Sequence, residues 1–371
     1  SVGGLVAFGL HRQGGRAGAP AVVEEPAEEA QPSSLIAVEL GTAVNAEVQR
    51  ALVGELLPSL RAMLRRELGV VLPGVEVRGE STAVAAEGYR VVLSEVPLVE
   101  GVVDGRRPLV LADPERLAQL GVAGAEPVTL VGTEGPVARL PSEAALERLA
   151  GQCEVIAPAT QIALHLGQAV QREAAALVGI QETQDLLDGL ERSHPALVNE
   201  VVPRLIPVQA LAEVLRRLLR EGVAIGDLRT ILEALAQGAV TDKDPIALTE
   251  QVRQALRRQL SFRYAGREGV LRALLLDPAI EEVVRESVQQ TAQGSFLALE
   301  PQIGEEIVEA IGGALKAHAA DEPPVILTSG EVRRFVRRLV EDPYPELPVL
   351  SYQELEPKVS VQPVARVSTA A

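Results

Sequence analysis

Residues 211–235 read LAEVLRRLLREGVAIGDLRTILEAL, and this stretch decides the fold of the middle of the chain. Its apolar residues recur every three or four positions, which is the spacing of one face of a helix. Gly222 and Gly226 interrupt the pattern, so the stretch predicts two helices joined by a short turn. The same helical periodicity extends outward from residue 159 to about residue 263.

On the N-terminal side the periodicity changes to a mixed pattern. Residues 35–40 predict a strand, and residues 47–68 predict a helix in which Pro58 introduces a new turn or a kink. Residues 75–78 and 89–93 alternate well enough to predict two further strands of a small sheet. Strand, helix, strand and strand in this order indicate an α+β sandwich.

Residues 102–157 differ in composition and hydrophobic pattern from the segments on either side. Glycines and prolines separate short β-like runs at 109–111 and 128–131, and a helix is expected at 142–149. We therefore predict a small inserted unit.

The C-terminal part predicts a second α+β layer, because helical and strand-like segments alternate there. We expect helices at 280–288, 303–319 and 331–340, and strands at 295–299, 325–328 and 349–350.

Composition excludes several classes of protein. The chain has 371 residues, a net charge of −16 and only 2% aromatic residues, so it offers neither the basic face nor the stacking platforms of a nucleic-acid reader. Its length allows two or three compact units. The single cysteine, Cys153, rules out an internal disulfide and a thiolate metal cage, and we expect it to be a packed, half-buried residue.

No catalytic motif stands out, so we expect no enzyme activity, no cofactor and no metal site. The four histidines lack metal-ligand spacing. His165, between Leu164 and Leu166, fits a packed histidine better than a catalytic base. The alternative from a different class is a soluble hydrolase whose site, with carboxylates or His165, forms only in the fold.

Two surface features carry more information. Residues 204–263 hold ten basic and seven acidic residues within an otherwise acidic chain, which suits ion pairing between copies of this chain or a merely solvated helix face. Residues 331–340 place arginines opposite apolar residues, which predicts a helix that either lies on a membrane surface or packs on its own sheet.

Several long strings resemble one family, the large export-gate proteins that type III secretion injectisomes share with flagella. The strings are QETQDLLD at 181–188, HPALVNEVVP at 194–203, LREGVAIGDLRTILEAL at 219–235, LTEQVR at 248–253, LTS at 327–329 and PVLSYQEL at 348–355. The resemblance covers most of residues 35–363.

This resemblance implies a multidomain α+β fold: a split α/β subdomain with a small inserted subdomain, a helical subdomain and a C-terminal α+β subdomain. The implied limits are 1–10 for the remnant of a last membrane helix, 11–34 for an acidic linker, 35–101 with 158–178 for the split subdomain, 102–157 for the inserted one, 179–265 for the helical, ring-forming one, 266–363 for the C-terminal one and 364–371 for a tail. A cloning scar or an unstructured end is the alternative for residues 1–10.

The implied function is that of a cytoplasmic ring, nine copies in size, at a bacterial inner membrane. The ring would dock export chaperones with their substrates, contact gatekeeper and stalk or ATPase components, help to order export, and reach the membrane through a missing N-terminal half. Strings at 258–264 and 288–297 favour the injectisome branch, and strings at 194–197 and 241–245 favour the flagellar alternative. A soluble adaptor without a membrane part is a further alternative.

The resemblance also implies two groups of site residues. The chaperone cleft falls on Glu126, Pro127, Thr129 and His165, although this chain lacks the phenylalanine of the flagellar motif and has Leu164 where that family has a threonine. Ring contacts are expected at Glu213, Arg216, Arg217, Arg220, Asp227, Arg229 and Glu233.

Overall fold

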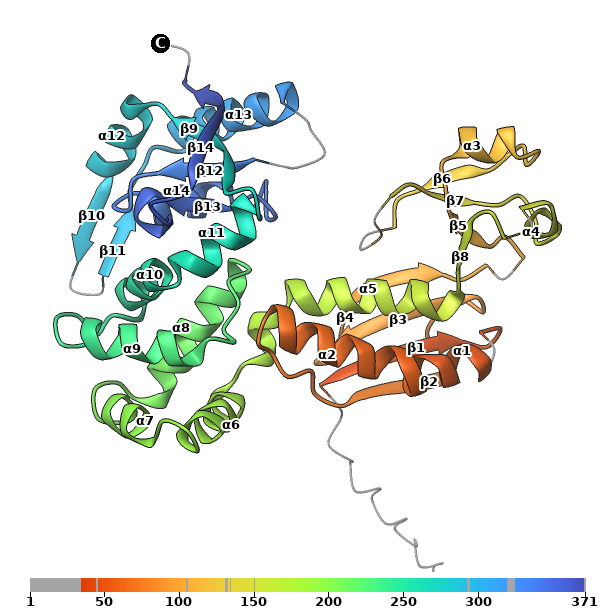
Figure 1. Cartoon of the computed structure of the whole chain (residues 1–371), viewed down its shortest axis with the longest axis horizontal. Coiled ribbons are helices and arrows are strands. Elements are labelled where there is room, and N and C mark those ends of the chain that lie inside the picture. Colours follow the sequence, from red (N-terminus) through yellow and green to blue (C-terminus); the bar gives the residue numbers. More distant parts are fainter. Residues whose placement is uncertain are drawn as a thin grey trace, which may run out of the picture.

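The computed structural model describes residues 35–44, 46–104, 106–130, 133, 135–149, 151–291, 294–318 and 324–369. The predicted membrane-helix remnant at 1–10 and the linker at 11–34 lie outside these residues. The chain forms two lobes (Figure 1). One lobe holds a four-stranded sheet with the inserted unit above it, and the other holds a helical unit beneath a second sheet.

The first sheet has the strand order β2-β1-β3-β4. It is built from β1 (Ile36–Gly41), β2 (Val75–Ser81), β3 (Gly88–Leu93) and β4 (Val96–Val102). The strands expected at 35–40, 75–78 and 89–93 are confirmed, while β4 was not predicted. The second and third predicted strands are not neighbours, because β1 lies between them, parallel to β2 and antiparallel to β3.

Helices α1 (Ala46–Ala51), α2 (Leu57–Glu67) and α5 (Pro158–Arg172) cover this sheet. Pro58 was expected to introduce a new turn or a kink, and the new turn is confirmed. A π-helical turn at Leu52–Leu56 leads directly into α2, and Pro58 stands in the first turn of α2, where its missing N–H costs little.

The inserted unit is a small antiparallel sheet with the order β6-β7-β5-β8. It comprises β5 (Leu109–Leu111), α3 (Pro114–Gln119), β6 (Glu126–Val128), β7 (Val137–Arg139), α4 (Ala144–Leu149) and β8 (Glu154–Ile156). The strand at 109–111 and the helix at 142–149 are confirmed. The strand expected at 128–131 ends instead at Val128, because Leu130 turns into a small core with Leu109 and Val137.

The helical unit confirms the helices that the apolar periodicity predicted. It contains α6 (Ile180–Glu191), α7 (Pro195–Val201), α8 (Val208–Arg220), α9 (Leu228–Gly238), α10 (Pro245–Ala255) and α11 (Arg257–Ala265). Its apolar residues share one continuous core with the first sheet. The turn after α8 touches the end of α2, where the Ile225 N–H donates to the Leu68 carbonyl at 2.8 Å. A side chain on Gly69 would collide with the backbone of Gly226, so this approach requires glycine.

The C-terminal unit is a parallel sheet with the order β13-β12-β9-β14. Its elements are β9 (Val270–Leu276), α12 (Pro278–Glu286), β10 (Val288–Thr291), β11 (Gly294–Leu297), α13 (Pro301–Ala317), β12 (Val325–Thr328), α14 (Arg333–Val340), β13 (Val349–Ser351) and β14 (Ser360–Val367). Every element predicted here exists. However, β11 pairs with β10 in a separate hairpin, and the strands β9, β10 and β14 were missed.

Helix α14 packs on its own sheet. Val332, Phe335, Val336 and Val340 are buried in the core of the C-terminal unit, so the membrane-surface alternative for this helix is wrong. Within the described residues, no helix combines the length and the apolar character needed to cross a membrane. The multidomain α+β fold is confirmed, and the limits of the individual units stay predictions.

Candidate functional site

His165 lies on α5 and contacts a buried tyrosine. Its Nδ1 is 2.6 Å from the Tyr89 hydroxyl on β3. Burial raises the pKa of Tyr89 to about 12, against an opposing hydrogen bond from Gln161, and burial lowers the pKa of His165. Both groups are therefore neutral near pH 7, as expected of a packed histidine. Cys153 is half-buried against the small core of the inserted unit, as predicted.

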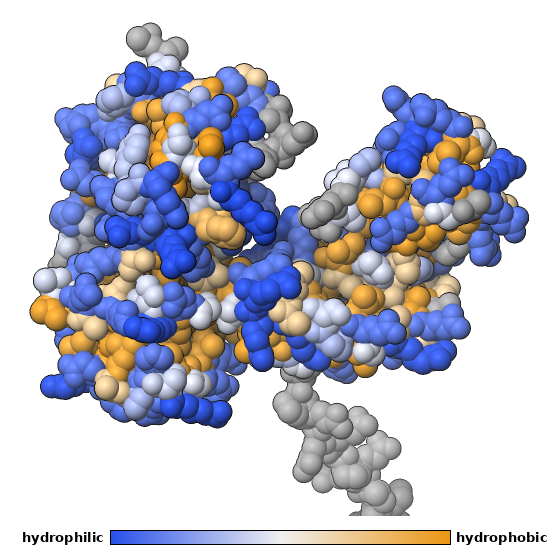
Figure 2. All heavy atoms as spheres, viewed as in Figure 1, coloured by the Kyte–Doolittle hydropathy of each residue, from blue (hydrophilic) through white to orange (hydrophobic). Residues whose placement is uncertain are grey.

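The predicted chaperone-cleft residues gather where the inserted unit meets α5. Glu126, Pro127 and Thr129 are exposed, and the Glu126 carboxylate is 2.8 Å from the Arg107 guanidinium. Beneath them Leu130 is buried, and Leu164 of α5 packs against the same apolar cluster. Figure 2 shows a wide gap between the two lobes, with hydrophobic side chains gathered over part of the inserted unit. The structure thus brings this segment beside the helix of His165.

The predicted ring residues pair within the chain. The Glu213 carboxylate on α8 lies 3.2, 2.9 and 3.6 Å from nitrogens of Arg216, Arg217 and Arg220, respectively. One carboxylate facing three guanidinium groups leaves this face of α8 positively charged. On α9, Asp227 caps the helix by accepting from the Thr230 N–H, and the exposed Arg229 and Glu233 pair at 2.8 Å. Pairs at i+3 and i+4 on a helix form easily within one chain.

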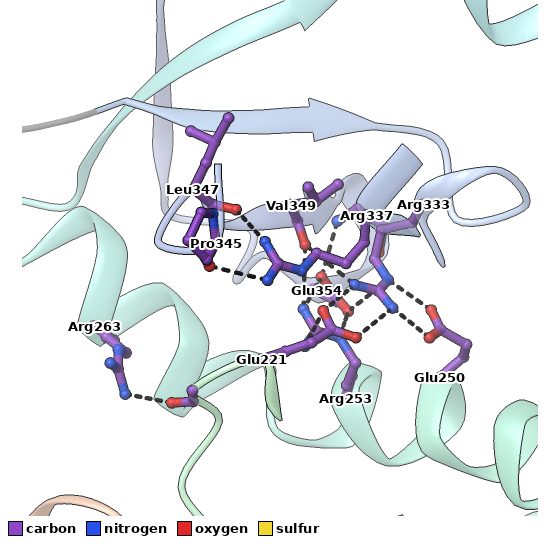
Figure 3. Close-up of polar contacts among 12 residues, drawn as sticks. Glu221, Glu250, Arg253, Arg263, Arg333, Arg337, Pro345, Leu347, Val349 and Glu354 are labelled. Atoms are coloured by element: carbon purple, nitrogen blue, oxygen red, sulfur yellow. Dashed lines mark hydrogen bonds and ion pairs between the residues drawn. The ribbon is translucent and has the colours of Figure 1, made fainter. Parts of the chain in front are cut away.

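Sequence reasoning missed the most strongly polar feature, a buried cluster between the helical and C-terminal units (Figure 3). Arg253 on α10 and Arg333 at the start of α14 have side chains that are 2% and 1% exposed. Three carboxylates surround them: Glu221 after α8, Glu250 on α10 and Glu354 after β13. We call these five residues the ion cluster.

The two arginines bind the carboxylates across the junction. Arg253 Nε donates to Glu354 Oε1 at 2.5 Å, which joins α10 to the turn after β13. Arg333 donates to Glu250 Oε2 at 2.7 Å and to Glu221 Oε2 at 2.6 Å. Figure 3 shows Glu221 and Glu250 on either side of the Arg333 guanidinium. Three pairs thus link the helical unit to the C-terminal unit: Arg253 with Glu354, and Arg333 with Glu221 and with Glu250. The pair of Arg253 with Glu221 lies within the helical unit, and the contact of Arg333 with Glu354 lies within the C-terminal unit.

Burial opposes charge on Glu221, Arg253 and Arg333, and the neighbouring opposite charges outweigh that cost. Burial alone would raise the pKa of Glu221, but Arg253 and Arg333 hold it at about 2. Burial likewise opposes charge on Arg333, yet Glu221 and Glu250 raise its pKa well above the ordinary value. Glu221 and Arg333 are therefore both charged at neutral pH.

The ion cluster corrects one sequence-based expectation. The sequence pattern placed Arg333 among the arginines opposite the apolar face of residues 331–340, whereas the structure buries it completely. The excess of arginine in residues 204–263 was the available signal, but it did not show which arginine is buried. Among the described residues, no three histidine, cysteine, aspartate or glutamate side chains are arranged to hold a metal ion.

We predict a pH-dependent contribution of Glu221 to stability. Its pKa is depressed in the folded state, so its contribution is complete above the ordinary pKa near 4.5 and disappears as the pH falls toward about 2. Glu221→Gln should therefore lower Tm by a constant amount between about pH 5 and pH 8, and the difference from wild type should shrink below that range. Calorimetry between about pH 8 and about pH 3 measures this difference in Tm, with the exposed Glu233→Gln as control. A difference that persists unchanged to about pH 3 would contradict the assignment.

The sequence of this chain matches a known protein family and several of its members. The family model described as the FHIPEP family matches residues 11–360. Low calcium response locus protein D of Yersinia pestis is 34% identical over 313 residues, covering 84% of this chain and 44% of the relative. Flagellar biosynthesis protein FlhA of Bacillus subtilis is 35% identical over 322 residues, covering 85% and 46%. The chain thus spans about half the length of the curated relatives it matches.

Solved structures show the same fold. The Chlamydia pneumoniae CdsV protein has a TM-score of 0.82 at 34% identity, covering 93% of this chain and all of that one. CdsV in its complex with CdsO has a TM-score of 0.80 at 34% identity, covering 90% of this chain and 97% of that one. The nonameric EscV cytosolic domain from the type III secretion system has a TM-score of 0.70 at 26% identity, covering 91% of this chain and 97% of that one.

These matches confirm the resemblance seen in the sequence strings. The family unites export components of type III secretion and flagellar systems and is not an enzyme family. The chain belongs to the FHIPEP family.

Proposed function

We propose that this chain is the cytoplasmic part of an export gate in a bacterial inner membrane. In this proposal it forms a nine-membered ring and receives export substrates bound to their chaperones. The observation that carries the proposal is the fold shared with the nonameric EscV cytosolic domain over 91% of the chain.

We place the protein in the injectisome branch. Support comes from Low calcium response locus protein D and from the sequence strings at 258–264 and 288–297. FlhA matches with similar identity, so a flagellar export gate with the same role is the second candidate. The CdsV–CdsO complex supports a further contact with another component of the secretion apparatus, and gatekeeper and stalk or ATPase proteins are the proposed candidates.

Ring assembly in this proposal uses the charged faces of α8 and α9. Glu213 is outnumbered by Arg216, Arg217 and Arg220, which leaves positive charge available for a carboxylate of the next copy. Arg229, Glu233 and Asp227 lie on the neighbouring exposed helix start. A head-to-tail contact repeated around a closed ring joins unlike faces, so such charges would meet different partners.

We predict that Arg229→Glu weakens self-association of the chain by at least about tenfold, because it replaces an attractive contact with a repulsive one. Sedimentation at rising concentration and low salt measures this effect. Arg204→Glu is the matched control, since Arg204 is also exposed and also pairs with a glutamate four positions away. A wild-type chain that stays monomeric even when tethered to a membrane would refute the ring. Normal assembly of Arg229→Glu would remove Arg229 from the interface.

The proposed docking site for chaperone–substrate complexes is the exposed segment Glu126, Pro127 and Thr129 together with α5 around His165. Its support is geometric: the segment is exposed above the apolar cluster that Leu164 joins, at the gap between the lobes. An apolar floor with a few polar groups at its edge is typical of protein-binding sites. The Tyr89 contact fixes the orientation of His165 there.

We predict that Thr129→Arg lowers the affinity for a chaperone–substrate complex of the same secretion system by at least about tenfold, because a bulky charge would stand at the edge of the apolar floor. Gln119→Arg is the control. It makes the same change on exposed α3, at the end of the inserted unit remote from α5 (Figure 1). Binding measured by calorimetry that is equal for both variants and wild type would exclude this segment from the docking site.

A further inference from the structure

A groove runs along α13 on the C-terminal unit, between this helix and α14. Its volume is about 520 Å³, and the end of β11 closes one side of it. Leu299, Val308 and Leu339 line it with apolar side chains. Gly304 also lines the groove, and a Cβ at this position would be in ordinary van der Waals contact with the side chains of Leu339 and Leu299, at 3.6 and 3.8 Å.

The rim of the groove is acidic. Glu300, Glu305 and Glu309 line it with exposed side chains. None of the three forms an ion pair with any other residue that the structure describes. Among the described residues that line the groove, the one cation is Arg338, and it is paired with Glu341. The groove therefore presents an apolar floor under uncompensated negative charge.

The dimensions suit a helix. The lining residues of α13 recur at Pro301, Glu305, Val308 and Glu309, which is one face of the helix over about two turns, or roughly 12 Å. An amphipathic helix placed in such a groove contributes apolar anchors at i, i+4 and i+7. Lysine or arginine on both flanks of its apolar stripe would meet the carboxylates of the rim.

We propose that this groove binds a basic amphipathic helix of a partner protein. The charge complementarity selects this occupant: an acidic helix would meet three carboxylates, and a purely apolar segment would leave them unpaired. This binding site is separate from the proposed docking site at Thr129 and from the charged faces of α8 and α9. It therefore stands whether or not those proposals hold.

The test uses the full 371-residue chain and a synthetic peptide as the probe. The peptide has about five helical turns, with leucines at i, i+4 and i+7 and lysines on the flanks. A scrambled peptide of the same composition keeps the charge and loses the apolar stripe. We expect fluorescence anisotropy to show saturable binding of the first peptide, weakened by salt, and at least about tenfold weaker binding of the scrambled one.

Two variants of α13 locate the binding. Glu305→Lys should weaken binding by about fivefold or more, because this carboxylate lines the groove. Glu306→Lys is the matched control: it is the next residue, equally exposed, and outside the groove lining. Gly304→Met should also abolish binding by filling the floor. Equal binding of the scrambled peptide, equal effects of Glu305→Lys and Glu306→Lys, or wild-type binding by a folded Gly304→Met chain would each overturn the proposal.

Discussion

Two guanidinium groups buried between the helical and C-terminal units constrain the rest of the structure. Taking an ion out of water costs several kcal/mol even after relaxation, and only well-placed opposite charges offset that cost. Arg253 and Arg333 meet this condition because Glu221 after α8, Glu250 on α10 and Glu354 after β13 converge on them. The Val349 carbonyl accepts a further hydrogen bond from each arginine. The position of each unit is thereby tied to the position of the other.

The other contacts between units rest on different physics. The first sheet and the helical unit share one apolar core, and the Gly69–Gly226 approach brings their backbones together. Apolar packing tolerates small shifts more readily than a cluster of buried charges does, because it is not directional. The inserted unit has small cores of its own, and Leu164 of α5 packs on one of them. The proposed docking site thus lies at a junction held by apolar packing, whereas the ion cluster lies at a junction held by buried charges.

Much of the fold was predictable, and the failures have physical causes. Helices with one apolar face, such as α8, can be predicted from the spacing of their apolar residues alone. The central strand β9 was missed because a parallel strand buried on both faces reads as a continuous apolar run, like a buried helix. The ion cluster was invisible because its partners are far apart in sequence: Arg253 and Glu354 are separated by 101 positions. Conversely, Glu213 and its arginines were visible as a charged group, but spacing could not show that they pair within the chain.

A double-mutant cycle on Arg253 and Glu354 tests most directly whether the ion cluster fixes the junction. Arg253→Met and Glu354→Gln alone should each lower the free energy of unfolding by about 3–5 kcal/mol. Each removes the nearest opposite charge of a buried group: among the described residues, Glu354 would keep only Arg333 at 3.8 Å, and Arg253 would keep only Glu221 at 3.2 Å. The double variant should cost at least about 2 kcal/mol less than the sum, and hydrogen exchange should localise the loss to α10 and β13. Strictly additive effects, or exchange unchanged at the junction, would contradict this account.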